Sequence, residues 1–88
     1  MFTKMKFYTY IIFSASLNKF YIGSTSDIEE RIVRHNQKSK GFTGNKSDWA
    51  LVYSESFKSR EDAIEREFQI KKWKSRKMIE KLISDFSA

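Results

Sequence analysis

The 88-residue sequence contains no cysteine, no proline and only three glycines. Without cysteine, neither a disulfide framework nor a thiolate metal site can form. The sequence also lacks an apolar run of about 18 residues, the length that a membrane-spanning helix needs. Its start, MFTKMKF, does not continue into the plain apolar stretch of a signal peptide. We therefore expect a soluble, unprocessed protein that resides in the cytoplasm.

What the chain does contain is enough for one small core. A chain of this size hides only about 60% of the surface of its unfolded state, so a second domain does not fit. Eight Phe, four Tyr and two Trp can fill the core. We expect residues 1–88 to form a single domain, with its core over about residues 6–86.

Charge points to a class of partner. Lys and Arg number 17 against 11 Asp and Glu, a net charge of +6, and a basic protein favours polyanions. The basic residues gather in KSKGFTGNK (38–46) and KKWKSRK (71–77), where Phe42 and Trp73 could stack on bases. The alternative is that these lysines only keep the protein soluble. The lysines expected to contact nucleic acid are Lys38, Lys40, Lys46, Lys71, Lys72 and Lys74.

Hydrophobic periodicity predicts six elements in the order ββαβαα. Ser26, Ser59 and Ser75 are the expected N-caps of the three helices. The polar stretch 37–48 is predicted to be a loop. The predicted elements are strands at 6–13 and 20–23, a helix from about residue 27 to near residue 36, a strand at 49–57, a helix at 60–73 and a last helix after residue 75.

Arg31 and the chain's only histidine, His35, are one helical turn apart. On a helix they are separated by about 40°, and both flank the apolar edge formed by Ile28 and Ile32. They can therefore converge on one spot. The alternative is a surface arginine beside a half-buried histidine that bonds to a neighbour.

Glu67 falls in the middle of the apolar face of the helix predicted at 60–73. Desolvating a carboxylate is costly unless a cation or hydrogen bonds compensate, so an inward-facing acid is a candidate metal ligand or catalytic acid. The alternative is a structural ion pair with Lys71, four residues later on the same face.

Strand alternation places two tyrosines so that they can face each other across the predicted hairpin. Tyr10 lies on one face of the first strand, and Tyr21 and Gly23 lie on one face of the second. The tyrosine pair could equally be core packing with hydroxyls at the rim. Gly23 would let another backbone or a ligand approach closely, or would serve a bend into the helix.

These motifs together resemble the GIY-YIG nuclease domain, in particular its small stand-alone bacterial members of the UPF0213 type. The resemblance covers about residues 7–83. It departs from the family pattern in the first triplet, which keeps only its last tyrosine, and in the absence of an Asn after Glu67. The ordered series that carries it is Tyr8-Thr9-Tyr10, Tyr21-Ile22-Gly23, Ser24-Thr25-x-Asp27, Arg31-x-x-x-His35-Asn36, Gly41-Phe42-Thr43, Trp49-Ala50-Leu51-Val52-Tyr53 and AIEREFQIKKW at 63–73.

The resemblance implies an α+β fold, with a central three-stranded antiparallel sheet flanked by helices, and hydrolysis of DNA phosphodiester bonds. By position, Glu67 would hold one Mg²⁺ or Mn²⁺, and Arg31 would stabilise the charge of the phosphate. His35 would transfer a proton or contact the phosphate. Tyr10 and Tyr21 would line the site, one of them binding the phosphate or assisting deprotonation of water.

The chain has no further segment after this domain to read a DNA sequence, so we expect structure-dependent or weakly specific cleavage of branched or nicked DNA, with a homodimer or an accessory protein as partner. The alternative from another class is a non-catalytic nucleic-acid-binding module that uses the basic stretches 38–46 and 71–77.

Overall fold

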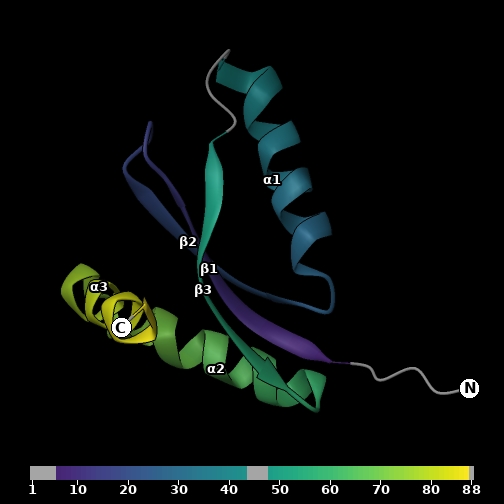
Figure 1. Cartoon of the computed structure of the whole chain (residues 1–88), viewed down its shortest axis with the longest axis vertical. Coiled ribbons are helices and arrows are strands. Elements are labelled where there is room, and N and C mark those ends of the chain that lie inside the picture. Colours follow the sequence, from purple (N-terminus) through teal and green to yellow (C-terminus); the bar gives the residue numbers. More distant parts are fainter. Residues whose placement is uncertain (1–5, 44–47, 88) are drawn as a thin grey trace, which may run out of the picture.

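The computed structural model describes residues 6–43 and 48–87, apart from the side chains of residues 38–43. Six elements follow in the predicted order ββαβαα. Figure 1 shows the strands between α1 on one side and α2 with α3 on the other. Their bounds are β1 (Phe7–Ser14), β2 (Lys19–Thr25), α1 (Ile28–Thr43), β3 (Trp49–Phe57), α2 (Arg60–Trp73) and α3 (Arg76–Ser87).

The three strands form one antiparallel sheet in the order β2-β1-β3, which confirms the expected sheet. β1 is the central strand, so both of its edges are hydrogen-bonded to a neighbouring strand. In the β1–β2 register Tyr10 lies opposite Gly23 and Ile12 lies opposite Tyr21. The β1–β3 pairing shifts register between Ile11 and Ile12, as at a β-bulge.

The two faces of β1 contact different parts of the molecule. Ile11 belongs to the core cluster with Tyr53 and Ile70, against which apolar side chains of α2 and α3 pack. Tyr10 points to the opposite face, where α1 lies, and is fully buried. Alternation along one strand therefore divides the molecule into a packing side and a side of aromatic and polar groups.

The helix starts follow from local capping. Ser59 accepts a hydrogen bond from the Asp62 amide at 3.1 Å, and Ser75 accepts one from the Met78 amide at 3.2 Å, as predicted. The expectation for Ser26 is wrong, because Asp27 caps α1 by accepting from the Glu30 amide at 3.1 Å. The Asp27 carboxylate, one residue after Ser26, accepts from one of the main-chain amides that the first turn of a helix leaves without partners.

The expected loop at 37–48 is also wrong over its first half, because α1 continues to Thr43. Gln and Lys are good helix formers, so a polar stretch without an apolar stripe can still extend a helix. Residues 44–47 lie outside the described part of the chain. None of the helices in the described residues combines the length and the apolar character that crossing a membrane requires.

Candidate active site

Tyr10, Tyr21 and His35 lie together on the α1 side of the sheet. The rings of Tyr10 and Tyr21 meet edge to face at 6.3 Å between centroids, and the Tyr21 and His35 rings are 4.3 Å apart. The Tyr10 hydroxyl is 3.5 Å from Nε2 of His35, at the outer limit of a hydrogen bond. The hairpin and α1 thus bring three of the predicted site residues into one cluster.

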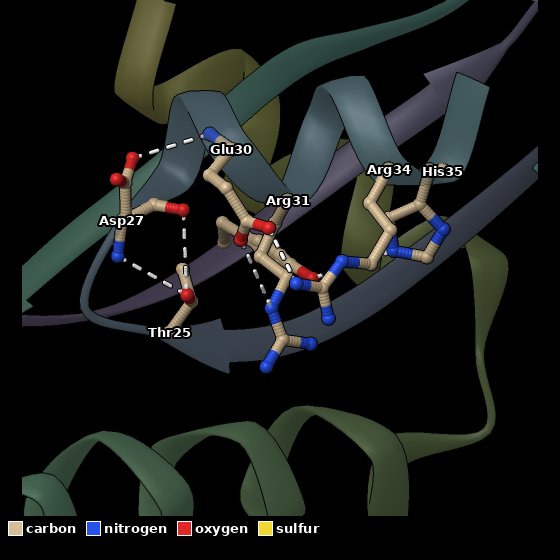
Figure 2. Close-up of polar contacts among 7 residues, drawn as sticks. Thr25, Asp27, Glu30, Arg31, Arg34 and His35 are labelled. Carbon is tan, nitrogen blue, oxygen red and sulfur yellow. Dashed lines mark hydrogen bonds and ion pairs between the residues drawn. The ribbon is translucent and has the colours of Figure 1, made fainter. Parts of the chain in front are cut away.

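Arg31 joins this cluster from one turn earlier on α1. Its guanidinium lies close enough to the Tyr10 phenol to lower the pKa of that group, and it also lies 4.0 Å from the carboxylate of Glu30. In Figure 2, Arg31, Arg34 and His35 extend from the same side of α1. The convergence of Arg31 and His35 that their spacing predicts is therefore present in the fold.

Gly23 is required by the position of Tyr10. A Cβ atom built on Gly23 would lie 2.7 Å from the Tyr10 hydroxyl oxygen and 2.9 Å from Cζ, closer than real Cβ atoms come to other atoms. The close neighbour of this glycine is therefore the phenol ring across the hairpin, and not a second backbone.

The two tyrosines differ in environment. Burial is the main cause that raises the pKa of Tyr10 to about 12, and repulsion between its ionised form and the neighbouring groups Tyr21 and Glu67 adds to it, although Arg31 acts in the opposite direction. Tyr10 is therefore a neutral phenol at physiological pH and can donate a hydrogen bond. Tyr21 is 40% exposed and is the tyrosine that a bound molecule can reach.

Arg34 also belongs to this region, although the sequence did not single it out. A small pocket of about 90 Å³ is lined by Tyr21, Arg31, Arg34 and His35. Arg34 also forms an ion pair with Glu30. The available signal was its position three residues after Arg31, which places both cations on neighbouring rows of one helix.

Glu67 comes to the same region from α2. Its side chain is only 14% exposed, and its charge acts on Tyr10. The carboxylate accepts a hydrogen bond of 2.6 Å from the Lys71 ammonium group, so the ion pair that was the structural alternative is formed. The ion pair compensates the buried charge in the structure described.

The donor set at Glu67 fits a hydrated divalent ion. The described residues include no group of three His, Cys, Asp or Glu side chains that could enclose a metal. Mg²⁺ needs no such cage, because it commonly binds through one or two carboxylates and keeps water and substrate phosphate as its other ligands. The single carboxylate of Glu67, which is near enough to act on the Tyr10 phenol, supplies the one protein ligand that such an ion needs.

Asn36 holds the middle of α1 to the sheet. Its side chain donates to the Trp49 carbonyl at 3.3 Å and accepts from the Trp49 amide at 2.9 Å. The Trp49 ring also lies 6.0 Å from the ring of His35. The asparagine that follows His35 thus fixes the helix turn that carries the histidine.

The two basic stretches behave differently. Lys71, Lys72 and Lys74 line a shallow hollow of about 600 Å³ on α2. Trp73 does not stack in the open, as its position suggested, because it packs partly buried against the core. The side chains of Lys38, Lys40, Phe42 and Lys46 lie outside the described residues.

A model of the GIY-YIG catalytic domain matches residues 6–81. The chain belongs to the GIY-YIG family. The resemblance seen in the sequence is thereby confirmed, and the GIY-YIG domain marks a family of nucleases that generally use divalent metals and act on DNA.

Relatives of this GIY-YIG protein carry the family name UPF0213. A UPF0213 protein of Staphylococcus saprophyticus is 36% identical over 81 residues, which cover 91% of this chain and 96% of that protein. One from Staphylococcus haemolyticus is 39% identical over 67 residues, covering 75% and 80%.

A solved structure extends the comparison to the fold. The solution NMR structure of a UPF0213 protein from Bacillus halodurans matches with a TM-score of 0.56 and 33% identity, covering 91% of this chain and 84% of that one. The sheet and helices described above are therefore the fold of this group.

Proposed function

We propose that this GIY-YIG protein is a divalent-metal-dependent DNA endonuclease whose site is formed by Tyr10, Tyr21, Arg31, His35 and Glu67. The observation that carries the proposal is that Tyr21, Arg31 and His35 line one small pocket. The buried Tyr10 hydroxyl lies 3.5 Å from His35, and the Glu67 carboxylate is close enough to act on the Tyr10 phenol. Structural roles alone do not require two arginines, a histidine and a phenol at one opening, with a second phenol buried beside them.

The arginines supply the phosphate contacts. Arg31 and Arg34 have rigid planar forks of donors that match phosphate oxygens. Both are about half exposed and share Glu30, which holds them at the pocket in the absence of a phosphate. A phosphodiester at the pocket exchanges that weak surface contact for direct hydrogen bonds.

The tyrosines divide two tasks. Tyr10 stays protonated and donates a hydrogen bond, because burial raises its pKa to about 12. Tyr21 is the exposed phenol and contacts the attacking water or a phosphate oxygen. His35 lies between them and accepts or donates a proton at Nε2, where the Tyr10 hydroxyl also approaches.

Glu67 would hold one Mg²⁺ or Mn²⁺, which lowers the pKa of bound water and neutralises developing charge on the phosphate. In this proposal, Lys71 exchanges its bond to Glu67 for a bond to substrate phosphate when the ion binds. The Glu67 carboxylate is thereby paired with a cation both with and without the metal ion. A largely buried charge is costly without such a partner.

The Glu67–Lys71 ion pair is also the observation that favours a second candidate, a nucleic-acid-binding module without catalysis. In that case the lysine is the permanent partner of Glu67, and the lysines of α2 bind phosphates only. Weak sequence specificity, action on branched or nicked DNA, a homodimer or accessory partner, and residence in the cytoplasm stay predictions under either candidate.

Cleavage of a panel of branched, nicked, single-stranded and duplex DNA with Mg²⁺ or Mn²⁺ tests the proposal. We expect metal-dependent cleavage by the wild type and its loss, by at least about a hundredfold, in Glu67→Ala, since electrostatic stabilisation of this kind typically contributes that much. Glu80→Ala is the matched control, because Glu80 forms an i,i+4 ion pair with Arg76 on α3.

No cleavage of any substrate by the wild type, with equal DNA binding by wild type and Glu67→Ala, would contradict the nuclease and support the binding module. Direct titration of Mn²⁺ provides a second measurement. The Glu67→Ala variant should lose Mn²⁺ binding while Glu80→Ala keeps it.

A further inference from the structure

We infer that the hollow on α2 around Phe68 is a binding site for an unpaired nucleobase, so that the protein prefers nucleic acid with a single-stranded segment. The inference deepens the proposed function, on which it rests for its place beside Glu67. It assigns Phe68, which no motif singled out, as the residue that stacks on the base.

Phe68 is the first observation. Its side chain is 55% exposed on a helix whose buried residues are Ala63 and Ile70. A phenyl ring at this position gains little from the core and presents a flat apolar face to solvent. Stacking on a nucleobase uses such a face without sequence preference, because every base has one.

The charge around this ring is the second observation. The hollow of about 600 Å³ is shallow and open to solvent, so it can take one flat ligand lying along the helix. Lys71 and Lys72 lie three and four residues after Phe68, which places them on the same strip of the helix. Three lysines against one glutamate make the hollow basic, as a path for a phosphate chain requires. Its lining consists of Glu65, Phe68, Gln69, Lys71, Lys72 and Lys74.

The hollow is connected to the candidate active site through one side chain. Lys71 lines the hollow and at the same time contacts Glu67 at 2.6 Å. A phosphate bound by Lys71 therefore stands between the stacked base and the Glu67 carboxylate. A strand that follows this path reaches the site with one base held outside a duplex.

Duplex DNA does not satisfy this arrangement, because its bases are already stacked on each other and must be extruded at a cost of a few kcal/mol. Single strands, flaps and branch points offer unstacked bases without that cost. The occupant that fits the hollow is thus a nucleotide of a single-stranded segment, and its charge excludes an acidic or purely apolar partner.

The test is equilibrium binding of a labelled oligothymidylate, measured by fluorescence anisotropy in EDTA so that cleavage plays no part. We expect Phe68→Ala to weaken binding on the order of tenfold, and Phe68→Tyr to bind like the wild type, because it keeps the ring. A blunt duplex of the same length should bind with nearly unchanged affinity to all three proteins. Phe86→Ala is the matched control, since Phe86 on α3 is 52% exposed.

A second arm uses an oligonucleotide of abasic sites, which keeps the phosphates and removes the bases. Wild type and Phe68→Ala should bind it equally, because neither has a base to stack. Equal affinity of the two proteins for the oligothymidylate, or the same loss on the abasic strand and on the duplex, would overturn the inference. Because the assay needs no metal and no cleavage, a protein that fails to cut DNA can still pass it.

Discussion

Tyr10 is the residue in which burial and function are most closely linked. Its phenol is fully buried, yet it contacts Arg31 and His35, the two groups placed to meet a phosphate. Burial keeps it protonated, and its ring dictates the glycine across the hairpin. One side chain therefore sets both the shape and the protonation state of this corner of the site.

The raised pKa of Tyr10 predicts a stability change at high pH. The folded state keeps the proton up to about pH 12, whereas an unfolded tyrosine loses it near 10. The stabilisation is therefore complete below pH 10 and is lost as pH rises towards 12. Urea denaturation at several values between pH 9 and 12 should show the wild type losing stability relative to Tyr10→Phe. A difference between the two proteins that stays constant over this range would contradict the shifted pKa.

Gly23→Ala should destabilise the protein by about 1–3 kcal/mol, because the added methyl group would overlap the ring of the fully buried Tyr10. Chemical denaturation measures the change. The same substitution in a Tyr10→Phe background should cost less, since the closest contact, to the hydroxyl oxygen, is then absent. Equal costs in both backgrounds would show that the ring is not what excludes a side chain at position 23.

At the scale of the elements, the site depends on how α1 is held against the sheet. The helix continues well beyond His35 to Thr43, and Asn36 bonds to both main-chain groups of Trp49 at the start of β3. This contact joins the helix to the edge strand at the turn that carries His35. The hairpin supplies the tyrosines, and the anchored helix supplies their partners.

Asn36→Ala should therefore lower the free energy of unfolding by about 1–3 kcal/mol, because two main-chain groups of Trp49 lose their partner. It should also reduce cleavage, since His35 is no longer fixed above Tyr21. Gln37→Ala, at an exposed position next in the helix, is the control and should change neither quantity. Loss of stability in both variants alike would point to general weakening of the helix.

At the scale of the whole molecule, the net charge of +6 acts through its distribution. The lysines of α2 line the hollow beside Glu67, whereas Lys81 on α3 is 77% exposed and pairs with Asp85 at 3.5 Å. A phosphate chain that crosses α2 is neutralised by the lysines at the hollow and not by Lys81, so only the hollow lysines contribute to counterion release.

Binding of DNA should accordingly weaken as salt increases, with a linear relation between the logarithms of affinity and salt concentration. Lys72→Ala should reduce that slope by about 1, whereas Lys81→Ala should leave it unchanged. Anisotropy titrations at several salt concentrations in EDTA provide the measurement. Equal slopes for the two variants would show that the charge acts only as a diffuse field.

The sequence by itself determined the elements, because the signals for them are local. β3 and α2 have the predicted bounds, and the caps at Ser59 and Ser75 follow from residues three positions apart. The family could also be identified from the sequence, because its motifs follow one another in a fixed order along the chain. Local signals failed at α1, where a polar stretch carries no stripe to distinguish a helix from a loop.

Only the tertiary structure decided which residues meet. The strand register places Tyr10 over Gly23. The face that each helix buries decides that Arg34 joins Arg31 at the pocket, and that Phe68 is exposed while Trp73 is packed. Periodicity gives a face but not the element packed against it. Contacts between residues far apart in sequence are fixed by the packing of the whole core, and no short stretch of the chain encodes them.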